Sequence, residues 1–244
     1  MRLTKRVFLA FLVIYFVPVT ANALWWAVKD RPANYKTANW EATGILPAPR
    51  NGEAALYVMA ARTGGMKGAI SVHSWLVFKK PDEADYQRYE VVGWGTALRH
   101  NALAPDAYWY SNQPYIVREL HDEAAVNAIA KVEQAIAAYP HGKAGDYTIF
   151  PGPNSNTFVA AILRAVPEIG VVLPPTAVGR DYIGRGFVAD YNKDTGDFRL
   201  SINGFGGLAI GRQSGIELNL SGLVAGIDFW PPGLKIPAIG RIGF

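Results

Sequence analysis

The chain has 244 residues, 50% of them hydrophobic and 18% charged, which is enough for one sizeable core or for one domain with a β-rich extension. It contains no cysteine, and this excludes disulfides, thiolate metal sites and thiol nucleophiles. The net charge is +4, but three of the cations lie in an acid-free leader, so the remaining body is nearly neutral. A nearly neutral body gives no electrostatic basis for binding nucleic acid.

The amino terminus has the layout of an export signal. Arg2, Lys5 and Arg6 precede an uncharged stretch over residues 7–28, and residues 21–23 read Ala-Asn-Ala, the spacing of a cleavage site. The stretch is also long enough to span a bilayer. Residues 1–28 are therefore predicted to be a signal peptide or a signal-anchor helix. Both place the body in the periplasm or on the outer face of the cytoplasmic membrane, with the membrane as a partner.

The first half of the body is rich in β-forming residues. Residues 29–53 are polar and proline-containing, which predicts a linker between membrane and body. Segments rich in β-formers follow. Residues 105–114 form an aromatic loop, and its Tyr108, Trp109 and Tyr110 would either line a cleft for an acyl chain or sugar or simply pack at the surface. The predicted strands are residues 55–63, 68–80 and 88–95.

Two helices are predicted in the middle of the chain. Over residues 122–140 apolar side chains recur at spacings of three and four, with Asp122 as a possible cap and Pro140 as the stop. A second helix is expected at about residues 156–166, ended by Pro167.

The last quarter of the chain is glycine-rich. A hairpin is predicted with its turn at residues 193–196, and residues 216–221 alternate apolar and polar as a half-buried strand does. The tail from residue 231 contains too many prolines for a strand interior. Strands, helices and strands in this order predict an α+β fold, with a core over residues 54–180 and a β region over 181–244 packed on it.

The segment "PGPNSNTF" at residues 151–158 delivers Ser155 to the start of the second helix. Either Asn154 or Ser155 would serve as an N-cap. A helix start also offers free N–H groups to a developing oxyanion, so Ser155 is a candidate nucleophile. Its base would be His73, the one histidine inside an apolar strand, although that position alone favours a core role.

Several segments carry a resemblance to a known family. "VHSW" at residues 72–75, "YEVVGWG", "PGPNSNTFV", "GRDY" and "LKIPAIGR" together resemble the bacterial domain-of-unknown-function family 3750 (DUF3750). More remotely, the order of parts is similar to circularly permuted papain-like hydrolases, the NlpC-type and lecithin–retinol acyltransferase-like enzymes. In those, a histidine strand precedes a helix that begins Asn-Cys-x-x-Phe-Val. Here Ser155 stands in place of the cysteine.

The resemblance implies a permuted papain-like core and a set of roles. Ser155 would be the nucleophile, His73 the general base, and Glu90 on the following strand the orienting group. Asn154, Asn156 and Thr157 would shape the site and its oxyanion region. Replacing a thiol by a hydroxyl means either that the site has been retuned to serine chemistry or that catalysis has been lost.

These observations predict an exported, membrane-proximal, serine-dependent amide or ester hydrolase or acyltransferase. Its substrates would be envelope peptides or lipids. The alternative is a catalytically inactive papain-like envelope protein with a binding or structural role. No pattern for a metal or a cofactor is found, because "GFGGLAIG" lacks a strand–turn–helix context and the acidic loop at residues 190–197 lacks calcium-loop spacing.

Overall fold

The computed structural model describes residues 2–243. It begins with one continuous apolar helix, Arg2–Val28, composed of α1 (Arg2–Phe11), η1 (Leu12–Phe16) and α2 (Val17–Val28). This helix is long and apolar enough to cross a membrane, a test that a signal sequence also passes. At 1.5 Å per residue its 27 residues extend about 40 Å, more than the hydrocarbon thickness of ~30 Å.

The core is a five-stranded antiparallel sheet in the order β4-β3-β2-β1-β5. Two helices, α3 (Asp122–Ala137) and α4 (Ser155–Ala165), bury their apolar sides against one face of this sheet. Aromatic loops cover the other face. The short helices are η2 (Gly65–Ala69) and η3 (Pro167–Ile169), and the strands are β1 (Ala55–Arg62), β2 (Val72–Lys79), β3 (Gln87–Val91), β4 (Leu98–His100) and β5 (Tyr115–His121).

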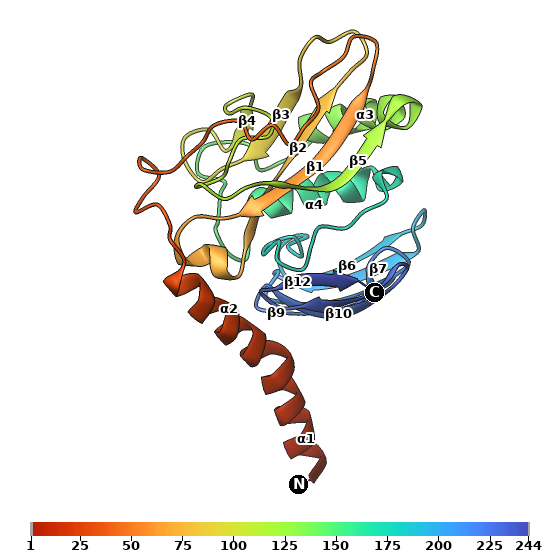
Figure 1. Cartoon of the computed structure of the whole chain (residues 1–244). Helices are drawn as coiled ribbons and strands as arrows, with labels where there is room; N and C mark the ends of the chain where they lie inside the picture. Colours follow the sequence, from red (N-terminus) through yellow and green to blue (C-terminus); the bar gives the residue numbers. More distant parts are fainter. Residues whose placement is uncertain (1, 244) are drawn as a thin grey trace.

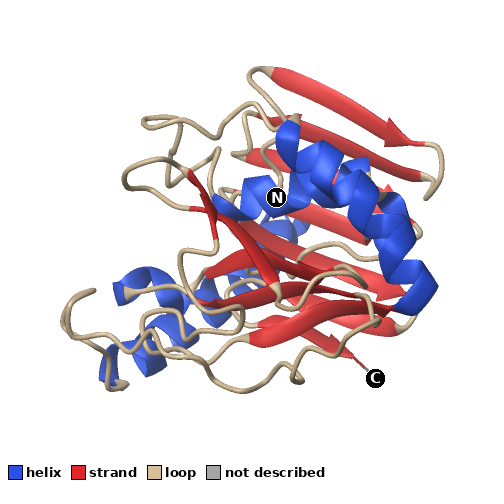
Figure 2. Ribbon diagram, turned by 90° about the horizontal axis from the view of Figure 1, so that it is seen from above, coloured by secondary structure: helices blue, strands red, loops and turns tan. Residues whose placement is uncertain are grey.

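The last quarter of the chain forms a second sheet, a seven-stranded antiparallel meander in which each strand pairs with the next along the chain. Helix α4 lies between the two sheets (Figure 1), and Figure 2 shows the helices and strands of the molecule from above. The structure is therefore α+β, as predicted. The strands of this sheet are β6 (Phe187–Asn192), β7 (Asp197–Ile202), β8 (Gly206–Gly211), β9 (Gly215–Leu220), β10 (Leu223–Phe229), β11 (Pro232–Ile236) and β12 (Gly240–Gly243).

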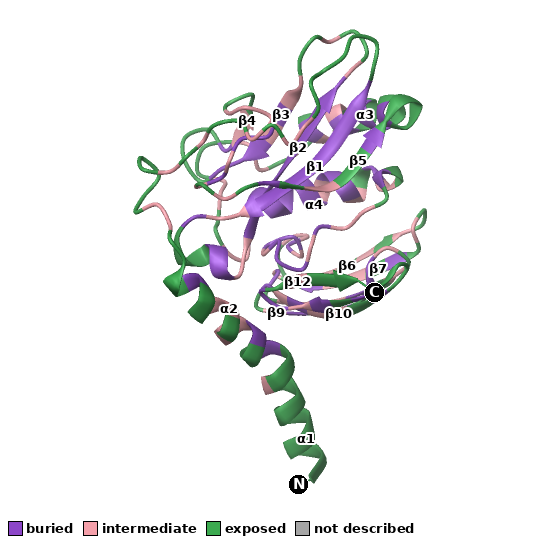
Figure 3. Cartoon of the chain, viewed as in Figure 1, coloured by how far each residue is buried: buried purple, intermediate pink, exposed green. Residues whose placement is uncertain are grey.

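The carboxyl end of the long helix is docked onto the body. Trp26 is 1% exposed and its Nε1 donates to Gly65 O at 2.9 Å, while Asn22 donates to Ala69 O in η2. A side chain at Gly68 would collide with the Trp26 ring, so the indole fills a space that only glycine leaves open. In contrast, the first turns of the helix are exposed along their whole length (Figure 3).

Residues 29–53 are irregular, as a linker would be, but they contact the core. Ala42 forms an isolated bridge with Ala107, and the Trp40 ring meets the Trp109 ring edge-on with centroids 5.2 Å apart. This segment closes the face of the sheet that the helices leave open.

Three local expectations were wrong. The tail contains β11 and β12, because Pro231 and Pro237 fall in turns and Pro232 opens a strand, positions at which a missing N–H is tolerated. The cap of α3 is His121 without a side-chain bond, and Asp122 is the first helical residue. Strand β5 comes directly after the aromatic loop, where no strand was expected.

The alternation at residues 216–221 is present but has the opposite sense to that of an ordinary half-buried strand. Glu217 and Asn219 are buried against the core, whereas Ile216 and Leu218 face outward and are exposed. The sequence period fixes only that neighbours point to opposite faces, and the packing decides which face is covered.

Candidate functional site

A pocket of about 830 Å³ lies at the end of the five-stranded sheet, where β2 begins and β3 ends. The start of α4 reaches the same place, so two segments 82 residues apart in the chain share one pocket. Its walls combine aromatic side chains with polar ones. The lining includes His73, Trp94, Trp109, Tyr110, Asn154 and Ser155.

A chain of three charged or titratable groups lies along β2 and β3. His73 Nε2 is 2.7 Å from Glu90 Oε2, and the same carboxylate oxygen accepts from Arg88 Nη2 at 2.9 Å. All three side chains are buried, with at most 4% of each exposed. A buried carboxylate with two charge-assisted partners is held in one position.

The environment favours a neutral imidazole and an ionised carboxylate. Burial lowers the pKa of His73, and the attraction of Glu90 opposes this only in part. Burial alone would raise the pKa of Glu90, but the hydrogen bond from His73 and the charge of Arg88 outweigh it and hold the pKa at about 2. Neutral His73 therefore carries its proton on Nε2, toward Glu90, and keeps a lone pair on Nδ1. Among the described residues Nδ1 has no hydrogen-bond partner.

Aromatic rings fix the orientation of these groups. The imidazole of His73 stacks on Trp109 with ring centroids 3.6 Å apart and planes 7° apart, and the guanidinium of Arg88 lies 4.4 Å over the Trp75 ring. Sequence reasoning missed Arg88, although it was open to detection, because it lies two residues before Glu90 on one strand and so shares its face. Trp109 was named from the sequence only as an aromatic that could line a cleft. Its stacking on His73 was not predictable, since a loop brings the ring there.

Of the two cap candidates at the start of α4, Asn154 and Ser155, the structure selects one. Asn154 is the N-cap, and its Oδ1 accepts from the N–H groups of Asn156 and Thr157 at 2.9 and 3.0 Å. Its Nδ2 donates to Ile149 O and Val178 O, so the whole amide is used in holding the loop. Ser155 is the first helical residue and has no part in the cap.

Asn156 and Thr157 also have their side chains fully engaged. Asn156 accepts from Ser74 Oγ and donates to Val72 O, both at 2.8 Å, and so binds the residues on either side of His73. Thr157 Oγ1 donates to Gly179 O at 2.7 Å. These side chains shape the site, and the first-turn N–H group left outside the cap is that of Ser155 itself.

His73 and Ser155 line the same pocket but are not bonded. No hydrogen bond joins Ser155 Oγ to His73 anywhere in residues 2–243. Along β2, Ser74 points toward α4 and His73 toward the opposite face, where it meets Trp109. The two side chains approach each other only around the end of the strand, where the pocket opens.

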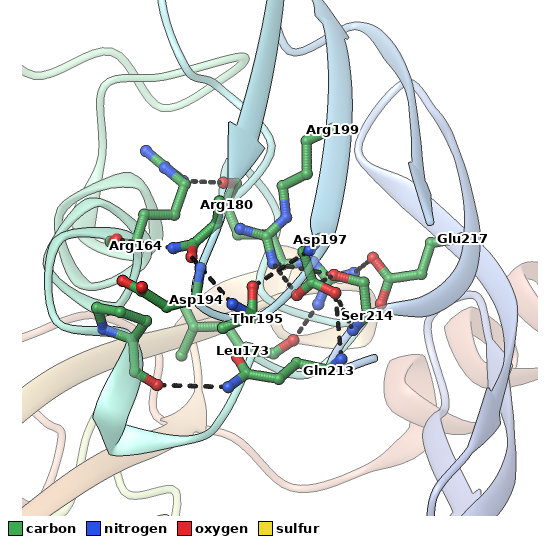
Figure 4. A network of polar contacts seen from close by, with 12 residues as sticks. Arg164, Leu173, Arg180, Asp194, Thr195, Asp197, Arg199, Gln213, Ser214 and Glu217 are labelled. Carbon is green, nitrogen blue, oxygen red and sulfur yellow. Dashed lines mark hydrogen bonds and ion pairs between the residues drawn. The ribbon is translucent and has the colours of Figure 1, made fainter. Parts of the chain in front are cut away.

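A second polar cluster lies between α4 and the seven-stranded sheet (Figure 4). Arg180 donates to Glu217 at 2.5 Å, Lys235 donates to the other oxygen of Glu217 at 2.5 Å, and Asp197 accepts from Gln213 N. The cavity beside them holds only about 40 Å³. Because these charges are mutually paired, the cluster attaches the second sheet to the core rather than offering a ligand site.

No curated protein and no solved structure matches the chain. One family does match, over residues 53–182, which is more than half of the chain and spans everything from the start of β1 to just beyond Arg180. The matched range contains the whole His73–Glu90–Arg88 chain and the start of α4, and it leaves out the apolar helix and the seven-stranded sheet. The chain therefore belongs to the family described as "Protein of unknown function (DUF3750)".

Proposed function

We propose that the pocket at the start of α4 is the active site of a serine-dependent amide or ester hydrolase or acyltransferase. It would have a permuted papain-like arrangement and act outside the membrane that its amino-terminal helix anchors it to. Ser155 is the nucleophile, His73 the general base and Glu90 the group that orients His73. The observation that carries the proposal is the 2.7 Å contact between His73 Nε2 and a buried, ionised Glu90.

This contact matters because of what it does to the imidazole. A base needs a free lone pair, a fixed tautomer and a partner that stabilises the imidazolium once it forms. Glu90 meets the second and third needs, and its position leaves Nδ1 directed elsewhere. Because burial lowers the pKa of His73, its imidazole is neutral at neutral pH and can accept a proton.

In the acylation step, Ser155 Oγ attacks the substrate carbonyl carbon and its proton moves to His73 Nδ1. The carbonyl oxygen becomes an oxyanion, for which the Ser155 N–H at the positive end of α4 is the available donor. The tetrahedral intermediate collapses, the proton passes from His73 to the leaving alcohol or amine, and an acyl-serine remains. Water or an acceptor alcohol or amine then releases the acyl group by the same steps in reverse.

The test is covalent labelling of the full-length protein in detergent with a fluorophosphonate probe. Wild type is expected to be labelled, and the rate should rise with pH through a midpoint below 6.5, because the pKa of His73 is lowered and only its neutral form acts as a base. Ser155→Ala should abolish labelling while keeping the stability of wild type, because Asn154 and not Ser155 caps the helix. Ser221→Ala, a change at another serine of the same pocket, is the matched control and should retain labelling.

Labelling that persists in Ser155→Ala, or wild type that stays unlabelled between pH 5 and 9, would overturn the proposal. The second result would favour the non-catalytic alternative, an envelope protein that uses the aromatic pocket for binding. That reading is supported by the missing hydrogen bond between Ser155 and His73 and by the cap, which occupies two of the N–H groups at the helix start.

A further inference from the structure

The two faces of the seven-stranded sheet carry the opposite side chains to those expected of a sheet that packs one face on a core. Its covered face carries charged and polar side chains, whereas its free face carries apolar ones. In a water-exposed antiparallel sheet the opposite is expected, apolar inward and polar outward. The covered set includes Asp197, Ser201, Glu217, Asn219, Asp228 and Lys235.

The apolar side chains form an unbroken row across every strand. Pairing registers place Tyr191 opposite Phe198, and the row continues strand by strand to Ile242 at the far edge. Each member is between 38% and 60% exposed. The members of the row are Tyr191, Phe198, Ile210, Ile216, Ile227, Leu234 and Ile242.

The row is part of a wider face. Leu218 and Ile202 add to it on neighbouring registers, and Phe205, Phe229 and Trp230 extend it at the strand ends. Six strand spacings of ~4.8 Å make the sheet about 29 Å wide, and six-residue strands make it about 20 Å long. A free apolar area on the order of 500 Å² lies at the upper end of what a soluble monomer exposes, and such patches mark interaction sites.

The contacts of the amino-terminal helix indicate what would cover this face. Tyr15, in the middle of the helix, donates from its hydroxyl to Leu218 O at 2.8 Å, and Asn22 donates to Ala238 O at 3.2 Å. The apolar helix thus touches the sheet that carries the apolar face. In Figure 1 the core lies on one side of this sheet, and the first turns of the helix leave the body on the other side.

We infer that the free face of the seven-stranded sheet lies on the lipid bilayer that the amino-terminal helix enters. Its apolar row reaches the boundary between head groups and acyl chains, about 5–10 Å deep, as an interfacial amphipathic element does. The edge strands stay at head-group level, where water satisfies their free backbone groups, so no open sheet edge enters the hydrocarbon. Exposed Trp230 and Tyr191 at the rim suit the interface, where such amphipathic rings gather.

The absence of native cysteine makes a direct test simple. Single cysteines at Ile210 and Ile227, on strands β8 and β10, carry a nitroxide label in the full-length protein reconstituted into phosphatidylcholine–phosphatidylglycerol vesicles. A label at Val126, exposed on α3 and remote from the sheet, is the matched control (Figure 1). We expect the sheet labels to lose accessibility to a water-soluble nickel relaxation agent and to gain it to oxygen, with the reverse at Val126.

A second arm separates the sheet from its anchor. In the double variant Ile210→Glu, Ile227→Glu, a label at Ile216→Cys should become water-accessible while a label at Val13→Cys on the helix stays in the lipid. Both changes are at exposed positions, so the fold should be kept, and circular dichroism checks it. Sheet labels that are as water-accessible as Val126, or that show dipolar coupling between copies of the chain, would overturn the inference. The second of these results would identify the face as a contact between two copies.

Discussion

Replacing Glu90 by glutamine tests whether the buried carboxylate holds the site together. The change keeps the shape of the side chain but removes the charge that Arg88 and His73 both face. Arg88, fully buried, would then face a neutral amide in place of the carboxylate, with Ala104 O at 2.8 Å and the Trp75 ring as its other partners. Removing one member of a buried ion pair typically costs 3–5 kcal/mol, because the other charge is left unpaired in a medium that solvates it poorly.

The pKa of Glu90 gives a comparable magnitude. A carboxyl whose pKa falls from its ordinary 4.5 to about 2 contributes about 3 kcal/mol to folding at neutral pH. Because the folded-state pKa is depressed, this contribution is complete above pH 4.5 and is lost as the pH falls toward 2. Glu90→Gln should therefore lower the free energy of unfolding by about 3 kcal/mol at pH 7 and should lack that part of the acid-induced loss of stability.

Urea denaturation of the full chain in detergent micelles, followed by tryptophan fluorescence at several pH values, measures both effects. Glu119→Gln is the matched control, since Glu119 lies on β5, an edge strand of the same sheet, with its side chain 54% exposed and a single contact to His121. Such a surface pair contributes at most about 1 kcal/mol. If Glu90→Gln destabilises the protein no more than Glu119→Gln does, then Glu90 is not the charged centre of the site and the reasoning fails.

Two further predictions rest on close packing. Gly179→Ala should lower the free energy of unfolding by more than about 2 kcal/mol, because the new Cβ would lie 2.1 Å from Asn154 Nδ2. Gly186→Ala, at a similar positive φ but in open space, should lower it by only about 1 kcal/mol. Equal losses in thermal or urea denaturation would mean that the Asn154 loop is free to move aside. Trp26→Ala should lower the free energy of unfolding by roughly 3–5 kcal/mol, because it empties the space over Gly68. Trp25→Ala, at an exposed position on the same turn, should change it little. Equal, small effects of the two tryptophan changes would show that the helix is not docked on the body.

Local patterns in the sequence predicted the elements whose signals are local. The hairpin turn at residues 193–196 was placed at its observed position, and the helix at residues 122–140 was predicted to within a turn at its end. The tail was mispredicted because proline count was given more weight than proline position. The polarity of the seven-stranded sheet was beyond the sequence alone, since alternation has the same period whichever face is covered.

In the candidate site, too, the features with local sequence signals could be predicted and those that depend on the tertiary fold could not. Ser155 at a helix start and His73 on a strand followed from neighbouring residues, and their catalytic roles remain predictions. Which of Asn154 and Ser155 caps the helix depended on backbone geometry that the sequence leaves open, and the structure assigns the cap to Asn154. The position of Trp109 against His73 depended on a long loop, for which no periodic signal exists.

The two proposals meet at the mouth of the pocket. Its wall includes residues 32–35, a few residues after the amino-terminal helix, and Gly65, to whose carbonyl Trp26 donates. Ser221, in the turn between β9 and β10, belongs to the same wall. If the sheet lies on the bilayer, the helix leaves the membrane near Tyr15, and the pocket opens beside Trp26, about 16 Å farther along the helix. That distance keeps it near molecules held at the membrane surface. Soluble substrates would gain nothing from that placement, whereas lipids or peptides attached to the membrane would be concentrated there. The two proposals fail separately, because Ser155→Ala leaves the sheet unchanged and Ile210→Glu, Ile227→Glu leaves the pocket intact. Loss of activity on vesicles alone, with fluorophosphonate labelling retained in the double variant, would connect them.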